Sequence, residues 1–256
     1  ILKELVQLDL GTSSIDLGRL AKNYSRSEGQ DLRSFLEQEL AGAIGGEKQT
    51  EPRDVVLYGF GRIGRLLARI LVAREATYGG VRLRAVVVRK KGDDDIVKRA
   101  SLLRRDSIHG PFNGTITVDH EKEIIWANGT AIQMIYSDDP SSIDYTAYGI
   151  NDAIVVDNTG RWRDRAGLSQ HLQSKGVQKA LLTAPGKGDV RNIVYGVNHS
   201  DITNDESDNI ISAASCTTNG ITPVLKVIQD DYGIDHGHVE TVHAYTNDQN
   251  LVDNFH

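Results

Sequence analysis

The chain has 256 residues, 39% of them hydrophobic, which is enough for one large or two ordinary domains with a sizeable core. Its 29 lysines and arginines are scattered and are outnumbered by 35 aspartates and glutamates, so no positive face for a nucleic acid is expected. The formal charge of -6 still leaves room for a small phosphorylated ligand, which needs only a few local donors.

No run in the sequence approaches the ~18 apolar residues that span a bilayer, and no secretory signal is present. We therefore expect no membrane contact and a cytoplasmic location. The chain begins at Ile1 rather than Met and stops at His256 within a patterned segment, so we expect the natural protein to extend past both ends.

Residues 1–50 differ in pattern from the rest of the chain and predict two helices separated by the polar stretch 25–30. Asp31 is positioned to cap the second helix. The apolar residues of that helix form one stripe at three- and four-residue spacing: Leu32, Phe35, Leu36, Leu40 and Ile44. The segment 45–53 is polar, contains glycine and proline, and is interpreted as a linker.

From residue 54 onward, short β-rich runs alternate with helical stretches, which is the rhythm of βαβ units and predicts an open parallel sheet. The parallel-type runs are residues 55–58, 83–88, 153–157, 180–183 and 210–214. Residues 63–76 predict a helix, and three runs within 115–136 predict a small antiparallel excursion. A further helix is expected after residue 216, and residues 238–246 alternate like a strand.

The motif GFGRIG at residues 59–64 follows a predicted strand and opens a predicted helix. Gly59 permits a tight turn, Gly61 lets the backbone approach a pyrophosphate, and Gly64 lets the helix lie close to the strand. Unpaired amides at the helix N-terminus would face the anion. The motif in this context resembles the dinucleotide-binding fingerprint of Rossmann folds, so we expect a Rossmann-type, doubly wound parallel sheet.

The second predicted strand ends at Val88, where an NAD-preferring site usually places an acid that binds the ribose hydroxyls. This chain has Arg89 and Lys90 there, and two cations favour the 2′-phosphate of NADP. The alternative is that both are solvated charges and that an aspartate at 93–95 reaches back to the ribose.

Cys216 is the only cysteine, so it makes no internal disulfide and no thiolate metal cluster, and no metal site is expected. It lies where a predicted strand ends and a predicted helix begins, a position that favours the nucleophilic thiolate. The hydroxyls of Ser215, Thr217 and Thr218 are unusual neighbours for a cysteine that only packs in a core, which is the alternative. His243 is either the base for this thiol or a histidine satisfied within a strand.

Four segments together resemble glyceraldehyde-3-phosphate dehydrogenase. They are GFGRIGR at 59–65, RDSIHG at 105–110, ASCTTN at 214–219 and TVHAYTNDQ at 241–249. Their order and spacing match that family over about residues 54–256, including the 27 positions from Cys216 to His243. Lys90 stands where an aspartate usually holds the ribose, so the chain resembles the NADP-using or dual-specificity members.

The resemblance implies that Cys216 attacks an aldehyde, that His243 assists, that hydride passes to NADP or NAD, and that inorganic phosphate releases an acyl phosphate. It implies that the substrate and inorganic phosphates are bound by Ser215, Thr217 and Thr246. The cofactor positions that it implies are Gly59, Phe60, Gly61, Arg62, Ile63, Arg89, Lys90, Thr159, Gly160 and Thr183. It also implies a homotetramer.

We accordingly divide the chain into a helical N-terminal extension with its linker (1–50), a dinucleotide-binding domain (51–215) and the incomplete start of an α+β catalytic domain (216–256). The family continues past the point that matches His256, so this stretch alone is not expected to turn over. The extension, which ordinary members lack, is interpreted as an oligomerisation arm or as a clamp across the nucleotide domain.

Two alternative functions remain open. One is a sister enzyme that oxidises another phosphorylated aldehyde, such as erythrose 4-phosphate, by the same thiol chemistry. The other is a nucleotide-binding scaffold or regulator that has lost catalysis, although the presence of both Cys216 and His243 counts against it.

Overall fold

The computed structural model describes residues 1–11, 15–27, 29–45, 52–78, 80–203 and 205–243. The chain divides into two compact units. The smaller unit comprises residues 1–52 and 73–82, and the larger comprises residues 53–72 and those from 83 onward. The predicted linker falls mostly within 46–51, outside the described residues.

The N-terminal segment forms three helices, α1 (Leu2–Leu5), α2 (Leu17–Tyr24) and α3 (Leu32–Glu39). They share a small core whose buried members are Leu5, Leu20, Phe35 and Leu36. The two helices predicted from the sequence are α2 and α3. Of the predicted apolar stripe, Leu32, Phe35, Leu36 and Leu40 pack in this core, but α3 ends at Glu39 and Ile44 lies beyond it, bridged to Leu10. The additional α1 has only four residues, too few to show a helical period.

Asp31 caps α3 as predicted. Its carboxylate accepts hydrogen bonds from the backbone N–H groups of Arg33 and Ser34, both at 3.2 Å. These donors have no partner inside the helix, so the cap satisfies groups that would otherwise need water. The start of α3 therefore depends on one carboxylate.

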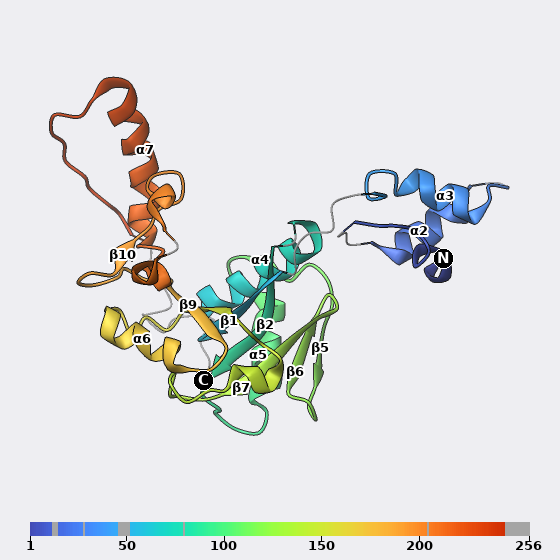
Figure 1. Cartoon of the computed structure of the whole chain (residues 1–256), viewed down its shortest axis with the longest axis horizontal. Helices are drawn as coiled ribbons and strands as arrows, with labels where there is room; N and C mark the ends of the chain where they lie inside the picture. Colours follow the sequence, from blue (N-terminus) through green and yellow to red (C-terminus); the bar gives the residue numbers. More distant parts are fainter. Residues whose placement is uncertain (12–14, 28, 46–51, 79, 204, 244–256) are drawn as a thin grey trace. The chain divides into compact units, whose positions relative to one another are not determined.

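The main sheet has nine strands in the described residues, in the order β10-β11-β9-β8-β1-β2-β7-β6-β5 (Figure 1). Their bounds are β1 (Arg53–Tyr58), β2 (Val81–Val88), β5 (Ile116–Asp119), β6 (Ile124–Ala127), β7 (Thr130–Tyr136), β8 (Ala153–Asp157), β9 (Val177–Leu182), β10 (Arg191–Asn192) and β11 (Ile210–Ser212). A separate antiparallel ribbon pairs β3 (Arg105–Asp106) with β4 (Gly110–Pro111).

The sheet is mostly parallel. β8 runs parallel to both β1 and β9, and β11 runs parallel to both β9 and β10. β5, β6 and β7 pair antiparallel, which confirms the predicted excursion, but β7 also joins the main sheet parallel to β2. The five parallel-type runs all form strands, so the predicted α/β class with a doubly wound parallel sheet is confirmed.

Helices connect the strands. They are α4 (Arg62–Tyr78), α5 (Asp95–Arg104), α6 (Arg165–Gln173) and α7 (Cys216–Tyr232), with 3₁₀ turns η1 (Tyr145–Tyr148), η2 (His199–Asp201) and η3 (Glu206–Asn209). The helix predicted after residue 216 is α7, and it buries none of its residues.

The strand predicted at 238–246 is wrong for its described part, because residues 238–243 form neither helix nor strand. An alternating pattern makes a strand only when a neighbour pairs with its backbone groups. The described residues place no strand beside this segment.

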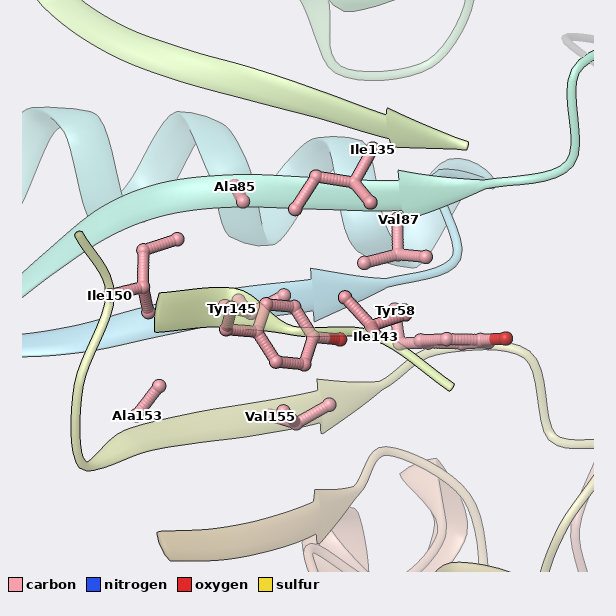
Figure 2. Close-up of a cluster of buried hydrophobic side chains, with 10 residues drawn as sticks. Tyr58, Ala85, Val87, Ile135, Ile143, Tyr145, Ile150, Ala153 and Val155 are labelled. Atoms are coloured by element: carbon pink, nitrogen blue, oxygen red, sulfur yellow. The ribbon is translucent and has the colours of Figure 1, made fainter. Parts of the chain in front are cut away.

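The central strands bury one face against the segment that contains η1. Figure 2 shows Val87 of β2 and Val155 of β8 close to Tyr145 of η1. Val56 and Tyr58 of β1 belong to the same cluster, because alternate residues of a strand lie on one face. This core fixes β1, β2 and β8, whose carboxyl ends form the site described below.

Replacement of Asp31 tests the N-terminal cap. Asp31→Ala should reduce the protection of the α3 amides by about 1 kcal/mol, because an orphan donor loses its acceptor. Hydrogen–deuterium exchange of residues 32–39 measures this loss. Asp31→Asn keeps a side-chain oxygen and should exchange like the wild type. Equal exchange in all three proteins would show that the cap contributes nothing.

Candidate functional site

The strand order changes direction at β1. From β2 the chain extends the sheet on one side to β7, β6 and β5, whereas β8 returns to the opposite side of β1. In open α/β sheets this switch point leaves a crevice at the carboxyl ends of the strands, where ligands bind. The glycine motif follows β1 directly and leads into α4, so it lies at that crevice.

The turn at residues 59–64 accepts only small residues at two positions. Gly59 has φ +96°, and a Cβ there would lie 2.9 Å from a methyl carbon of Thr159. A Cβ on Gly64 would lie 2.4 Å from the carbonyl oxygen of Gly59. At Gly61, by contrast, a Cβ would meet nothing within 4 Å, so the backbone here faces open space. This geometry fits a pyrophosphate lying against the turn.

A cavity of about 610 Å³ opens at this edge of the sheet. It is lined by five of the predicted cofactor positions: Gly59, Phe60, Gly61, Arg89 and Thr159. Sequence reasoning did not identify its other lining residues, Tyr58, Arg65, Val87, Val88, Lys91, Arg99, Ser137, Asp138, Arg161 and Trp162. Arg161 and Trp162 follow Gly160 in the sequence, which was the available signal for them.

The cavity is strongly cationic. Its lining includes Arg65, Arg89, Lys91, Arg99 and Arg161, against the single carboxylate of Asp138. The Arg161 guanidinium lies over the Trp162 ring, 4.8 Å from the ring centroid, which combines charge and an aromatic wall at one side. A ligand with several negative charges fits such a lining.

Lys90 and Lys91 occupy different places. The Lys90 ammonium lies 3.6 Å from the Glu123 carboxylate and 5.0 Å from the centroid of the Tyr136 ring, and Lys90 does not line the cavity. Lys91 does line it, beside Arg89. Of the two cations singled out in the sequence, the structure therefore places Arg89 at the cavity and Lys90 away from it.

Asp95 shapes the loop that carries these cations. Its carboxylate lies 2.5 Å from Nε of Arg99 and accepts the Lys91 N–H at 3.1 Å. Arg99 in turn donates to the carbonyl oxygen of Arg89 at 3.1 Å. Asp95 is 1% exposed and, like Asp93 and Asp94, does not line the cavity. The alternative in which one of these aspartates reaches the ribose finds no support in this arrangement.

The turn after β8 is held by a buried carboxylate. Asp157 accepts the N–H and the hydroxyl of Thr159, both at 2.7 Å, and its other oxygen lies 3.0 Å from Nε2 of His171. Its carbonyl oxygen accepts the Thr183 N–H at 3.0 Å. The predicted positions Thr159, Gly160 and Thr183 are thus ordered together, although only Thr159 lines the cavity.

Arg62 and Ile63 also lie outside the cavity lining. Nε of Arg62 is 3.4 Å from the Asp106 carboxylate, and the Ile63 side chain is 51% exposed. Burial alone would raise the pKa of Asp106, but hydrogen bonds from His109 and Ile108 and the Arg62 charge outweigh it. The pKa of this carboxyl consequently lies well below its ordinary value of 3.8.

Cys216 is the first residue of α7 and is exposed. Ser215 caps the helix, and its hydroxyl accepts the Thr218 N–H at 3.0 Å. Cys216, Thr217 and His243 line one hollow of about 440 Å³, in which Nε2 of His243 lies 2.8 Å from the Thr217 hydroxyl. His243 lies outside any described strand.

The hollow at Cys216 and the cavity at the glycine turn have no lining residue in common. Thr246, the third predicted phosphate-binding residue, lies outside the described residues. The structure thus brings together Cys216, Thr217 and His243, and separately brings together the cofactor positions around the turn.

No described helix combines the length and apolar character needed to cross a membrane. Within the same part of the chain, no cluster of three or more His, Cys, Asp or Glu side chains is arranged to hold a metal ion.

The switch point, the glycine turn and the cationic cavity define a dinucleotide-binding domain of the Rossmann class. Residues 53–165 match the family model of the glyceraldehyde 3-phosphate dehydrogenase NAD binding domain, and residues 215–256 match that of the C-terminal domain of the same enzymes. The chain belongs to the glyceraldehyde-3-phosphate dehydrogenase family.

Relatives of known name agree with this assignment. A glyceraldehyde-3-phosphate dehydrogenase-like protein of Pseudomonas aeruginosa is 60% identical over the whole of this chain and 56% of its own length. Glyceraldehyde-3-phosphate dehydrogenase of Zymomonas mobilis is 41% identical over 79% of this chain and 56% of its own length, and that of Thermotoga maritima is 36% identical over 78% and 56%. The chain thus spans little more than half the length of these relatives.

Acid titration tests the environment of Asp106. Because its folded pKa lies below the unfolded value, the ionised carboxylate stabilises the fold above pH ~4, and this contribution is lost as the pH falls through the lowered value. Asp106→Asn should cost about 1–3 kcal/mol at neutral pH and flatten the loss of stability in acid. Urea unfolding from pH ~6 down to pH ~2 measures both, with the exposed Asp93→Asn as a control that should follow the wild type. If the free energy of unfolding of Asp106→Asn fell with decreasing pH as steeply as that of the wild type, this account would be contradicted.

Proposed function

We propose that the protein is a phosphorylating glyceraldehyde-3-phosphate dehydrogenase that uses NADP or NAD. The observation that carries this proposal is the meeting of Cys216, Thr217 and His243 in one hollow at the start of α7. A cysteine at a helix N-terminus beside an imidazole is the arrangement that activates a thiol as a nucleophile. The cationic cleft in the same chain supplies the place for a dinucleotide.

In the proposed reaction the Cys216 thiolate adds to the aldehyde carbon, forming a carbon–sulfur bond, and the aldehyde oxygen takes up a proton to give the thiohemiacetal. His243 accepts the proton of the thiohemiacetal hydroxyl as the carbon is oxidised to the thioester. The nicotinamide ring, when bound, supplies the hydride acceptor. Inorganic phosphate then attacks the thioester carbon, the carbon–sulfur bond breaks, and the acyl phosphate leaves with Cys216 restored.

The neighbouring hydroxyls take the phosphates in this proposal. Ser215 and Thr217 flank the nucleophile, and Thr217 already contacts Nε2 of His243 at 2.8 Å. Thr246 is proposed for the phosphate of the substrate itself on the resemblance alone. Backbone amides at the start of α7 are suited to stabilise the oxyanion of the tetrahedral intermediate.

For the cofactor, we propose that the pyrophosphate lies at Gly59–Gly61 with Arg62 and Ile63 nearby, and that Thr159, Gly160 and Thr183 border the cleft. Arg89 stands at the carboxyl end of β2, where the adenosine ribose is bound in this class of fold. With no carboxylate from residues 93–95 at the cavity, Arg89 and Lys91 favour the 2′-phosphate of NADP.

We further propose the division of the natural protein into an N-terminal extension (1–50), a dinucleotide-binding domain (51–215) and a catalytic domain that begins at residue 216. The small helical core of the extension supports its being an independent element. A homotetrameric assembly is proposed from the family alone.

An assay of the intact protein tests the function directly. With glyceraldehyde 3-phosphate and inorganic phosphate, we expect reduction of NADP and NAD with a higher kcat/KM for NADP. Erythrose 4-phosphate serves as the competing substrate, and faster turnover of it would overturn the substrate assignment. No turnover of either aldehyde, with cofactor still bound, would instead support a nucleotide-binding scaffold.

Thiol reactivity tests the nucleophile. Cys216 should alkylate rapidly with iodoacetamide at neutral pH, with parallel loss of activity, because the proposed reaction uses it as the nucleophile. Cys216→Ser should abolish turnover while leaving cofactor binding unchanged. Since Cys216 is the sole cysteine of the chain, this variant is also the control for labelling of the chain. Labelling no faster than that of a free thiol would contradict the proposed role.

The two adjacent lysines form a matched pair for cofactor preference. Lys91→Ala should lower kcat/KM for NADP by about tenfold or more with little effect on NAD, because a charge-assisted contact to the 2′-phosphate is lost. Lys90→Ala removes the same charge one residue away and should leave the ratio of NADP to NAD efficiency near the wild-type value. Equal effects of the two substitutions would show that only the general positive field matters.

A further inference from the structure

Tyr58, the last residue of β1, carries a buried hydroxyl without a hydrogen-bond partner among the described residues. The residue is 4% exposed. A buried hydroxyl that gives up water without a replacement destabilises the free protein. Where such a group borders a cavity, a ligand in that cavity can complete its hydrogen bond.

The Tyr58 hydroxyl differs in position from the other buried tyrosine hydroxyl that lacks a partner among the described residues, that of Tyr145. Tyr145 also has a fully buried hydroxyl without a partner, and it belongs to the same core cluster. Figure 2 shows the Tyr145 ring lying back among the strands, whereas the Tyr58 ring extends past the end of β1. Tyr58 lines the cavity at the glycine turn, and Tyr145 does not.

The Tyr58 ring is held rigidly. The Trp162 ring lies edge-on at 5.8 Å between centroids, and the buried His171 ring lies edge-on at 4.8 Å. Burial and, to a smaller extent, the nearby carboxylates of Asp157, Asp139 and Asp138 together raise the pKa of Tyr58 to about 12, against a lowering by the Arg161 charge. At neutral pH the group is therefore protonated and able to donate a hydrogen bond.

The layout of the cavity indicates which part of a dinucleotide this donor meets. The pyrophosphate belongs at Gly59–Gly61, and the adenosine ribose belongs at the end of β2. The rest of the lining contains Val87 and Trp162, an apolar and aromatic wall suited to a planar base, together with the polar Ser137. Tyr58 and Trp162 are in ring contact, so the Tyr58 ring borders this part of the cavity.

We propose that Tyr58 is a cofactor-binding residue whose hydroxyl donates a hydrogen bond to the adenosine half of the bound dinucleotide. The proposal rests on the function proposed above, in which this cleft binds NADP or NAD. It assigns Tyr58 a role in affinity for the cofactor, distinct from the chemistry at Cys216.

Conservative substitutions of the two tyrosines test this role in the intact protein. Tyr58→Phe should weaken binding of NADP by about five- to tenfold, because one neutral hydrogen bond to the ligand is lost. ADP-ribose, which is NAD without its nicotinamide ring, should lose affinity by the same factor. Nicotinamide mononucleotide should bind as it does to the wild type. Isothermal titration calorimetry measures all three.

Tyr145→Phe is the matched control, because it removes an equally buried and unpartnered hydroxyl from the same core without touching the cavity. It should bind every ligand as the wild type does. Neither variant should lower the unfolding temperature of the free protein, since neither hydroxyl has a partner to lose.

Wild-type affinity for ADP-ribose in Tyr58→Phe, or an equal loss in Tyr145→Phe, would overturn the role of Tyr58 while leaving the proposed dehydrogenase function intact. Failure of the wild type itself to bind NADP, NAD or ADP-ribose would overturn both. The two failures are thus distinguishable.

Discussion

The close approach of α4 to the end of β1 is the constraint on which the cleft depends. Gly64 lies so near the carbonyl of Gly59 that any side chain at residue 64 would collide with the backbone. Because the helix begins this near the strand, its first amides point into the crevice between β1 and β8. The glycines thus determine where the cavity lies, and the five basic side chains and the Trp162 ring line it.

Much of the fold could be predicted from the sequence, because the spacing of apolar residues indicates which segments form strands and helices. The runs that became β1, β2, β8, β9 and β11 are short, apolar and rich in β-branched residues, and the glycine motif marks the first strand-to-helix turn. Residues 238–243 show the limit of this reasoning, since alternation specifies a face but supplies no neighbouring strand. The parallel pairing of β7 with β2 is equally non-local and leaves no trace in the sequence of either strand.

The sequence predicted the positions at which a motif defines the backbone conformation. It predicted less well the positions at which the orientation of a side chain decides whether the residue lines the site. Cys216 and its hydroxyl neighbours were identified because a strand-to-helix junction defines their environment. Lys90 was not distinguishable from Lys91, because the ion pair with Glu123 joins segments far apart in the chain. The sequence likewise did not predict that the Tyr58 hydroxyl lacks a hydrogen-bond partner in the described part of the chain, because a tyrosine at the end of a buried strand has the same pattern as an ordinary core residue.

Lys91 lines the cavity and Lys90 does not, and this difference has a consequence for how such proteins diverge and how they can be redesigned. In a short loop, deleting or inserting one residue changes which side chain stands at each later position. A length change between β2 and α5 would exchange which lysine meets the cavity while the composition of the loop stayed the same. Comparisons of homologues should therefore align this loop by its anchor, the Asp95 carboxylate on the Lys91 amide, instead of by the identity of its basic residues.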